Sequence, residues 1–447
     1  MNNKEMKLLR KTDFILNALL AAALLTTSDG LYGHIAAADT VQGNISSVSV
    51  AANSATPVLK PIWQAKTNGT RLYDKQAPMS NGLVYYAASG KLIAADLKTG
   101  QLKWSIPGGH SPEVITNNSV FYTTNGGDLV RANARNGKVI WKVKGVNAFS
   151  EAGAHAGLVS GTLVYFNENG GLAAYSPSNG KKKWENKALP MYASSLIGQY
   201  DGVLVVSSTV DNYRTQFFGL DPATGKQKWR TEGVYSFLAY RNGQLIMRRQ
   251  PDLSTVTGGV PTPGYLVTWV QLNPRTGKVT RTENYTPLDD VSRLGNSYTS
   301  IAGPYLYTAD GNLDKNGAFL RRYTLGQDSN TEPVSYERFG KWLAGPINGM
   351  AFFAQGTELI GVKLNDLSAI SYGNSPSPVS RVQTLGRGVF ASLDNGDFYL
   401  IEVATGKRLG RISTKATEIG NAYTVDGMLL VQTNKGLFAA ALPKSLK

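Results

Sequence analysis

The chain has 447 residues, of which 42% are hydrophobic and 17% are charged, and its formal net charge is +15. This balance is ordinary for a soluble protein with a large apolar core. The lack of any Cys excludes disulfides, thiolate chemistry, Cys-based metal sites and a lipid anchor on an N-terminal Cys. The basic charge favours contact with anionic surfaces, although no Lys or Arg cluster is dense enough to indicate nucleic acid.

The first 38 residues have the pattern of an export signal. Four cations precede an apolar stretch from Phe14 to Leu25, and small residues suit cleavage before Asp39. The stretch is too short to span a bilayer unless it is extended, so we expect a cleaved signal peptide, with an uncleaved anchor as the alternative. Residues 39–57 predict a flexible lead-in and residues 58–447 a single domain. The protein is therefore predicted to be exported, to the periplasm or to the cell wall and extracellular space.

A phrase in which a Gly turn leads into a strand with a Trp recurs at intervals of about 40 residues. Its first copy reads AADLKTGQLKW, and in the first four copies the Trp stands four residues after the Gly. The repeated residues are Gly100, Gly137, Gly180, Gly225, Gly277 and Gly406, with Trp104, Trp141, Trp184 and Trp229. Gly permits the positive φ of a tight hairpin, and an Asp or Asn four residues earlier, such as Asp96, can accept hydrogen bonds from turn amides. We expect the tryptophans to be structural and to cover apolar surface between units.

Two further strand signals precede each turn, so each unit predicts four short antiparallel strands, the blade of a β-propeller. The predicted fold class is therefore all-β. The last unit ends after three strands, and the N-terminal strand at residues 61–65, with Trp63, supplies its fourth and closes the ring. A literal count gives nine units. We expect eight blades, on the assumption that one irregular unit after Gly277 does not form a blade of its own.

The segments Ala94–Trp104 and Gly219–Trp229 resemble the repeat phrase of PQQ-like (quinoprotein-type) β-propellers, Ala-x-Asp-x-x-Thr-Gly-x-x-x-Trp. The resemblance extends over residues 61–443 and is specific in the first four units. For the quinoprotein alcohol dehydrogenases it would imply PQQ held against a vicinal disulfide, beside Ca²⁺. Without Cys that disulfide is missing, so we expect no PQQ. In size the chain is more similar to the family's non-catalytic outer-membrane assembly propeller, although the Cys that carries that protein's lipid is missing here.

Histidines suited to catalysis are few. His110 and His155 lie in connections that converge on one face of a propeller, near Glu113 and Glu151. Two histidines and two carboxylates at the channel mouth can bind a divalent metal or perform acid–base chemistry. The alternative is that these are solvated loop residues.

A second candidate metal site has oxygen side chains at alternate positions. Asp310, Asn312, Asp314 and Asn316 can wrap a hard cation such as Ca²⁺. Lys315 stands where such loops usually have Gly, which favours the alternative of a plain hairpin loop. Ca²⁺ at this loop is the one cofactor that the sequence leaves open.

The Gly-, Pro- and Thr-rich insertion at residues 251–264 predicts either a recognition loop or an unstructured decoration. We predict a non-catalytic scaffold that uses loops on one face to hold a protein partner or an anionic cell-wall or polysaccharide surface. The alternative is a polysaccharide-active enzyme with a Ca²⁺-assisted site in the central funnel, which two converging carboxylates would indicate. We expect a monomer that contacts the membrane only through its signal and binds no nucleic acid.

Overall fold

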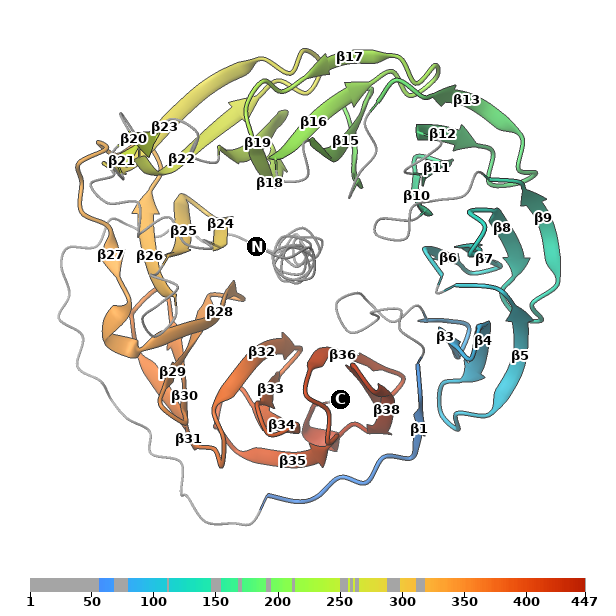
Figure 1. Ribbon diagram of the computed structural model, residues 1–447. Coiled ribbons are helices and arrows are strands. Elements are labelled where there is room, and N and C mark those ends of the chain that lie inside the picture. The colour runs from blue at the N-terminus through green and yellow to red at the C-terminus, as the bar shows by residue number, and fades with distance from the viewer. Residues whose placement is uncertain are drawn as a thin grey trace, which may run out of the picture.

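The chain folds into a closed ring of blades (Figure 1). The computed structural model describes residues 56–67, 79–110, 112–145, 154–167, 171–189, 194–210, 214–249, 256–257, 260–261, 265–287, 298–310 and 318–446. These residues form nine four-stranded antiparallel sheets. The predicted all-β propeller is confirmed. Within these ranges no helix is long and apolar enough to cross a membrane.

Each blade follows chain order from its innermost to its outermost strand. Blade 1 is β2 (Met79–Ser80), β3 (Leu83–Ala88), β4 (Lys91–Asp96) and β5 (Leu102–Pro107); blade 2 is β6 (Val114–Thr116), β7 (Ser119–Thr123), β8 (Leu129–Asn133) and β9 (Val139–Val143); blade 3 is β10 (Ala154–Val159), β11 (Thr162–Asn167), β12 (Gly171–Tyr175) and β13 (Lys182–Asn186). Blade 4 is β14 (Ser195–Tyr200), β15 (Val203–Val210), β16 (Arg214–Leu220) and β17 (Gln227–Arg230); blade 5 is β18 (Tyr235–Arg241), β19 (Gln244–Arg249), β22 (Tyr265–Leu272) and β23 (Val279–Pro287), with the hairpin β20 (Val256–Thr257) and β21 (Val260–Pro261) between its second and third strands.

The second half of the ring repeats this order. Blade 6 is β24 (Tyr298–Ala302), β25 (Tyr305–Asp310), β26 (Phe319–Thr324) and β27 (Val334–Ser335); blade 7 is β28 (Lys341–Ile347), β29 (Met350–Gln355), β30 (Glu358–Lys363) and β31 (Ala369–Asn374). Blade 8 is β32 (Val379–Leu385), β33 (Gly388–Leu393), β34 (Asp397–Glu402) and β35 (Arg408–Ser413); blade 9 is β36 (Ile419–Val425), β37 (Met428–Thr433), β38 (Gly436–Ala441) and β1 (Trp63–Ala65). Two short 3-10 helices, η4 (Glu337–Phe339) and η5 (Lys444–Leu446), complete the described elements.

The expectation of eight blades was wrong, and the literal count of nine is right. Both units that follow blade 5 form complete four-stranded sheets. In the first of them the outermost strand is only β27, with two residues paired to β26, because the connection before it bends through residues 325–333. The repeat phrase consists of the turn and the outermost strand, so a blade with so short an outermost strand has a weak copy of it. The inner three strands of this blade are intact.

Strand β1 closes the ring as predicted. It pairs antiparallel with β38, with Trp63 opposite Ala439 and Ala65 opposite Leu437. Just before β1 the chain runs along the outside of β35, where Val58 forms a parallel bridge with Arg411 (Figure 1). The N-terminal segment is therefore hydrogen-bonded to blades 8 and 9.

The apolar core lies between neighbouring blades rather than within one layer. The cluster between blades 1 and 2, for example, joins Tyr85, Leu92 and Trp104 to Val120 and Tyr122. The middle strands of each blade are buried on both faces, which is why β3, β33 and β37 are buried along their whole length. Each blade is thus stabilised mainly by its neighbours.

The connections divide between two faces of the ring. We call the turn face the side with the first-to-second and third-to-fourth strand connections, and the loop face the side with the others. Two-residue turns such as Asn81-Gly82 and Asp201-Gly202 recur on the turn face, with positive φ at both residues, as type I′ hairpins require. On the loop face the connections range from the two residues Ser89-Gly90 to the whole of 250–264. Connections on the turn face therefore vary less in length than those on the loop face, although blade 6 departs from the pattern with residues 325–333.

Candidate functional site

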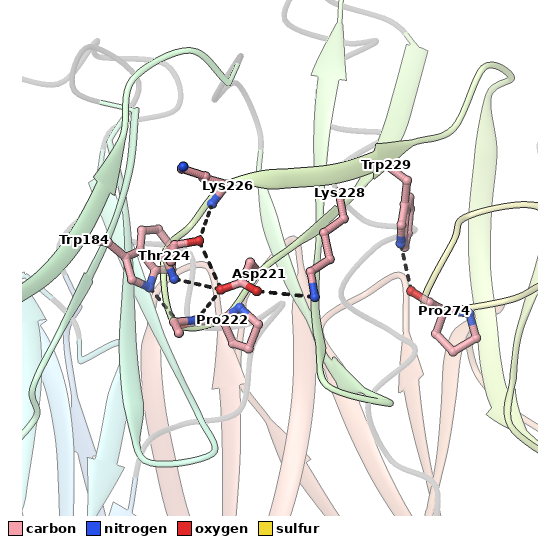
Figure 2. A network of polar contacts seen from close by, with 9 residues as sticks. Trp184, Asp221, Pro222, Thr224, Lys226, Lys228, Trp229 and Pro274 are labelled. Atoms are coloured by element: carbon pink, nitrogen blue, oxygen red, sulfur yellow. Dashed lines mark hydrogen bonds and ion pairs between the residues drawn. The ribbon is translucent and has the colours of Figure 1, made fainter.

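Each repeated Trp lies on the outermost strand of its blade and covers the turn Gly of the next blade. A Cβ added to Gly225 would come within 2.2 Å of the Trp184 ring, and one added to Gly277 within 2.6 Å of Trp229. The indole N–H also donates to the carbonyl three residues before that Gly, which we call the junction carbonyl (Figure 2). The turn requires Gly because any Cβ at this position would collide with the indole ring of the neighbouring blade.

The same contact occurs at five consecutive junctions. The indole-to-carbonyl distances are 2.8 Å for Trp63 to Leu97, 3.1 Å for Trp104 to Ala134, 3.1 Å for Trp141 to Pro177, 2.8 Å for Trp184 to Pro222 and 2.8 Å for Trp229 to Pro274. The glycines beneath are Gly100, Gly137, Gly180, Gly225 and Gly277, each with φ between +66° and +71°. Trp63 makes this contact from blade 9 to blade 1, so the closing strand uses the same device as the other four.

The acidic residue of the turn also has the predicted role. Asp221 accepts hydrogen bonds from the backbone N–H groups of Ala223 and Thr224 at 3.0 and 2.9 Å, and from the Thr224 hydroxyl (Figure 2). The Thr224 hydrogen bonds lower the pKa of Asp221, because they stabilise the charged carboxylate. The turn thus has stabilising hydrogen bonds of its own, in addition to the contact with the Trp.

Other side chains replace Trp in the second half of the ring. The Tyr372 hydroxyl donates to the junction carbonyl of Val403 at 3.0 Å, and the Arg322 guanidinium donates to that of Leu364 at 3.4 Å. On β35 the Trp position is Gly410, and Leu59 from the N-terminal segment fills the space, 2.3 Å from where a Cβ would lie. These replacements were missed in the sequence, because neither Tyr372 nor Arg322 lies at the spacing of the repeat phrase.

The junction between blades 5 and 6 is different. Arg281 stands on β23 at the Trp position, opposite Gln271, and forms an ion pair with Glu283. Glu283 accepts hydrogen bonds from the Trp269 indole at 3.0 Å, from the Gly326 backbone N–H at 2.9 Å and from the Tyr285 hydroxyl. Burial alone would raise the pKa of Glu283, but these hydrogen bonds and the Arg281 charge lower it below its ordinary value. Polar contacts thus join these two blades, whereas an indole joins the blades at each of the five preceding junctions.

Glu283→Gln is expected to destabilise the protein by about 1–3 kcal/mol near neutral pH, because it weakens hydrogen bonds at a largely buried carboxylate. A lowered pKa in the folded state stabilises above the unfolded pKa, and this contribution is lost as pH falls through the folded pKa. The gap between wild type and variant should therefore shrink below the ordinary value of 4.5. Denaturant unfolding at several pH values measures it. The exposed Glu185→Gln is the control, and a gap that stays constant with pH would contradict the assignment.

A cavity of about 230 Å³ opens at this junction on the turn face. Its walls are mainly apolar, from Ile246, Trp269, Ile301 and Leu325, and Arg241 and Arg281 lie at its rim. The Arg241 guanidinium donates to the Gly303 carbonyl at 2.8 Å and so links the first turns of blades 5 and 6. The cavity combines an apolar interior with a positive rim.

The predicted histidine pocket is described only in part. His110 lies between β5 and β6 and interacts with Asn125, and Glu113 immediately precedes β6. His155 is in strand β10 rather than in the connection before it, and its ring stacks on Phe166 with centroids 4.6 Å apart. Glu151 lies outside the described residues. The pocket stays a prediction.

The predicted Ca²⁺ loop falls almost wholly outside the described residues. Asp310 is the last residue of β25, paired with Phe319, whereas Asn312, Asp314 and Asn316 are not described. Across the ranges that the structure does describe, no three His, Asp or Glu residues are grouped so that they could hold a metal ion. Calcium binding at this loop also stays a prediction.

Exposed cations follow the third-to-fourth turns and outermost strands of blades 1–5. They are Lys98, Lys103, Arg135, Lys138, Lys142, Lys181, Lys182, Lys183, Lys226, Lys228, Arg230, Arg275, Lys278 and Arg281, which we call the basic arc. Ion pairs such as Lys228 with Asp221, at 3.3 Å, neutralise only part of it. The corresponding residues 325–335 and 364–374 in blades 6 and 7 include no Lys or Arg. The charge is therefore unevenly distributed around the rim.

Comparison with protein families gives one match. Residues 48–209 match a PQQ-type family whose description is "Outer membrane protein assembly factor BamB". This stretch runs from before β1 into β15, and the match confirms the resemblance to the PQQ-like propeller repeat there. A comparison with curated proteins gives no match.

Solved structures of low sequence identity are also similar to the chain. BamB from Moraxella catarrhalis has a TM-score of 0.40 and 14% identity, covering 87% of this chain and 98% of its own. The quinohemoprotein alcohol dehydrogenase from Comamonas testosteroni has a TM-score of 0.42 and 13% identity, covering 86% and 78%. The computationally designed Ika8 protein has a TM-score of 0.44 and 11% identity, covering 82% and 95%.

Proposed function

We propose that the protein is an exported, non-catalytic scaffold that holds a protein partner on its loop face. The observation that carries this proposal is the contrast between the two faces. First-to-second turns are two residues long in every blade, and third-to-fourth turns share one hydrogen-bond pattern in blades 1–5, 7 and 8, whereas loop-face connections range from Ser89-Gly90 to residues 250–264. Connections that vary on a rigid frame are where binding specificity usually lies.

Two further observations support the proposal. The family matched by residues 48–209 is described as an outer membrane protein assembly factor, which favours a protein partner. The basic stretch, apolar stretch and small residues at the N-terminus have the pattern of an export signal. Both support a partner in the cell envelope.

A second candidate partner is an anionic envelope polymer. The basic arc favours it, because regularly spaced cations along the rim of five blades attract a polyanion. Binding of this kind weakens as salt rises, since exposed charges are screened over about 10 Å at about 0.1 M ionic strength.

The test is capture from the envelope fraction of the source cells on immobilised protein, with quantitative mass spectrometry. In the first variant, an Asn-Gly turn replaces residues 250–264, the longest loop-face connection. In the control, Lys98→Ser alters the turn face. We expect wild type and control to enrich the same protein, and the loop variant to lose it.

Equal yields from all three proteins would overturn the loop-face assignment, and enrichment of no protein would overturn the scaffold proposal. Material that is carbohydrate rather than protein, and that elutes as salt rises, would assign the polymer instead.

A further inference from the structure

The cavity between blades 5 and 6 occupies the place that an indole fills at five other junctions. Leu325 is the counterpart of Leu97 in the first blade. The Leu97 backbone N–H donates to the Gly82 carbonyl at 2.8 Å, and the Leu325 N–H donates to the Pro304 carbonyl at 2.9 Å. Leu97 offers its carbonyl to Trp63, whereas Leu325 lines the cavity. The junction therefore retains the residue that carries the junction carbonyl, whereas Asp328 stands where the other junctions have Gly and Arg281 stands where they have Trp.

The size and lining of the cavity suit one aromatic side chain. Its volume of about 230 Å³ lies below the roughly 300–1,000 Å³ of typical small-molecule pockets. Ile246, Ile301 and the face of Trp269 supply apolar walls. Aromatic anchors that enter such pockets dominate many protein–protein interfaces.

The charged residues at the rim of the cavity favour a negatively charged ligand. Arg241 and Arg281 are both exposed, and Glu283 is the one carboxylate among the lining residues. Glu283 is already engaged by Trp269 and Gly326. Arg281 is itself paired with Glu283, so the three charged groups leave a net charge of +1. An incoming segment with carboxylates beside its aromatic residue would meet chiefly the Arg241 guanidinium, which pairs well with a carboxylate.

We propose that this cavity binds a Trp side chain from an acidic segment of a partner protein, inserted as the chain's own tryptophans are at the other junctions. This site is on the turn face and does not depend on the loop-face proposal. The protein then has two separate docking surfaces.

Fluorescence polarisation with two labelled peptides tests the proposal directly. One peptide is Asp-Glu-Trp-Glu-Asp, and the other has Ala in place of Trp. We expect wild type to bind the Trp peptide about tenfold or more tightly than the Ala peptide, as an aromatic anchor would require. Equal affinity for the two peptides would overturn the proposal.

Arg281→Trp provides the matched variant, because it places an indole at the position that Trp229 has in the preceding blade. We expect the Trp peptide to lose its advantage. Filling the cavity and losing the ion pair of Arg281 with Glu283 have opposite effects on the thermal midpoint, so circular dichroism is used only to verify that the variant is folded. The control is Arg275→Trp, the same substitution on the exposed turn of blade 5, and it should bind like wild type. Undiminished binding by Arg281→Trp would contradict the site.

If Arg281→Trp fails to fold, Arg241→Gln gives a second measurement. It should weaken binding of the acidic peptide at low salt and leave the preference for Trp over Ala intact. An unchanged affinity would exclude the charged rim. Capture from the envelope fraction with folded Arg281→Trp separates the two proposals, because partners of the loop face should remain.

Discussion

Replacing Gly225 with Ala is expected to lower the free energy of unfolding by about 2–4 kcal/mol. Two costs add. The residue has φ +69°, which L side chains rarely adopt, and its new Cβ would lie 2.2 Å from the Trp184 ring. The Trp must move, and its hydrogen bond to the Pro222 carbonyl is strained with it. Denaturant unfolding followed by tryptophan fluorescence and circular dichroism measures the loss.

Gly202→Ala is the matched control for this prediction. Gly202 has φ +75°, in a turn at the same end of the same blade, and nothing lies within 4 Å of its added Cβ. Only the backbone cost of about 1–2 kcal/mol should remain. If the two variants lose equal stability, the contact between Trp and Gly is not what holds neighbouring blades together.

Trp63→Ala is expected to lower the free energy of unfolding by about 3–5 kcal/mol and to open the ring. The side chain is 8% exposed, covers Gly100 and belongs to a strand of only three residues. No covalent connection holds that strand to β38. Loss of the indole should therefore release the N-terminal segment, which limited proteolysis with mass spectrometry of the cleaved fragments detects.

Trp104→Ala is the control that distinguishes opening of the ring from the loss of packing between two blades. Trp104 has the same exposed fraction of 8% and makes the same contact, to Gly137 and Ala134. The substitution should lower the free energy of unfolding by a similar amount. However, strand β5, which carries Trp104, is covalently continuous with β4 through a tight turn. Early cleavage near the N-terminus is expected for Trp63→Ala only. Early cleavage in both variants would mean that β1 has no special part in closure.

Much of this fold could be predicted because one contact explains the repeat phrase. Gly, the residue four before it and the Trp four after it each have a local physical cause, so copies of the phrase identify blades directly. Blades 6 and 7 have weak copies because other side chains make the junction contact. At blade 7 the turn residue is Leu367 with φ +59°, and the donor to the next blade is Tyr372. In these blades other residues make the turn and the junction contact, but they do not stand at the spacing of the repeat phrase. The blade count was underestimated for this reason.

The cavity could not be predicted for a related reason. In the sequence, Arg281 cannot be distinguished from the other basic residues of its strand. Its role depends on Trp269 in β22 and on Leu325 in the connection after β26, which only the packing of two blades brings together. The sequence could have indicated the site only through the departure from Trp at that position.

The pairing of β1 with β38 also sets a limit on when the ring can be completed. Of the described strands, the first that the ribosome makes has as its partner the last, so no shorter product of translation can close. Before that moment the edge of β38 does not exist and the N-terminal strand has no place to pair. Translation must therefore finish before the last blade is whole, and chains that stop early are left with an unpaired strand edge, which can pair with other chains.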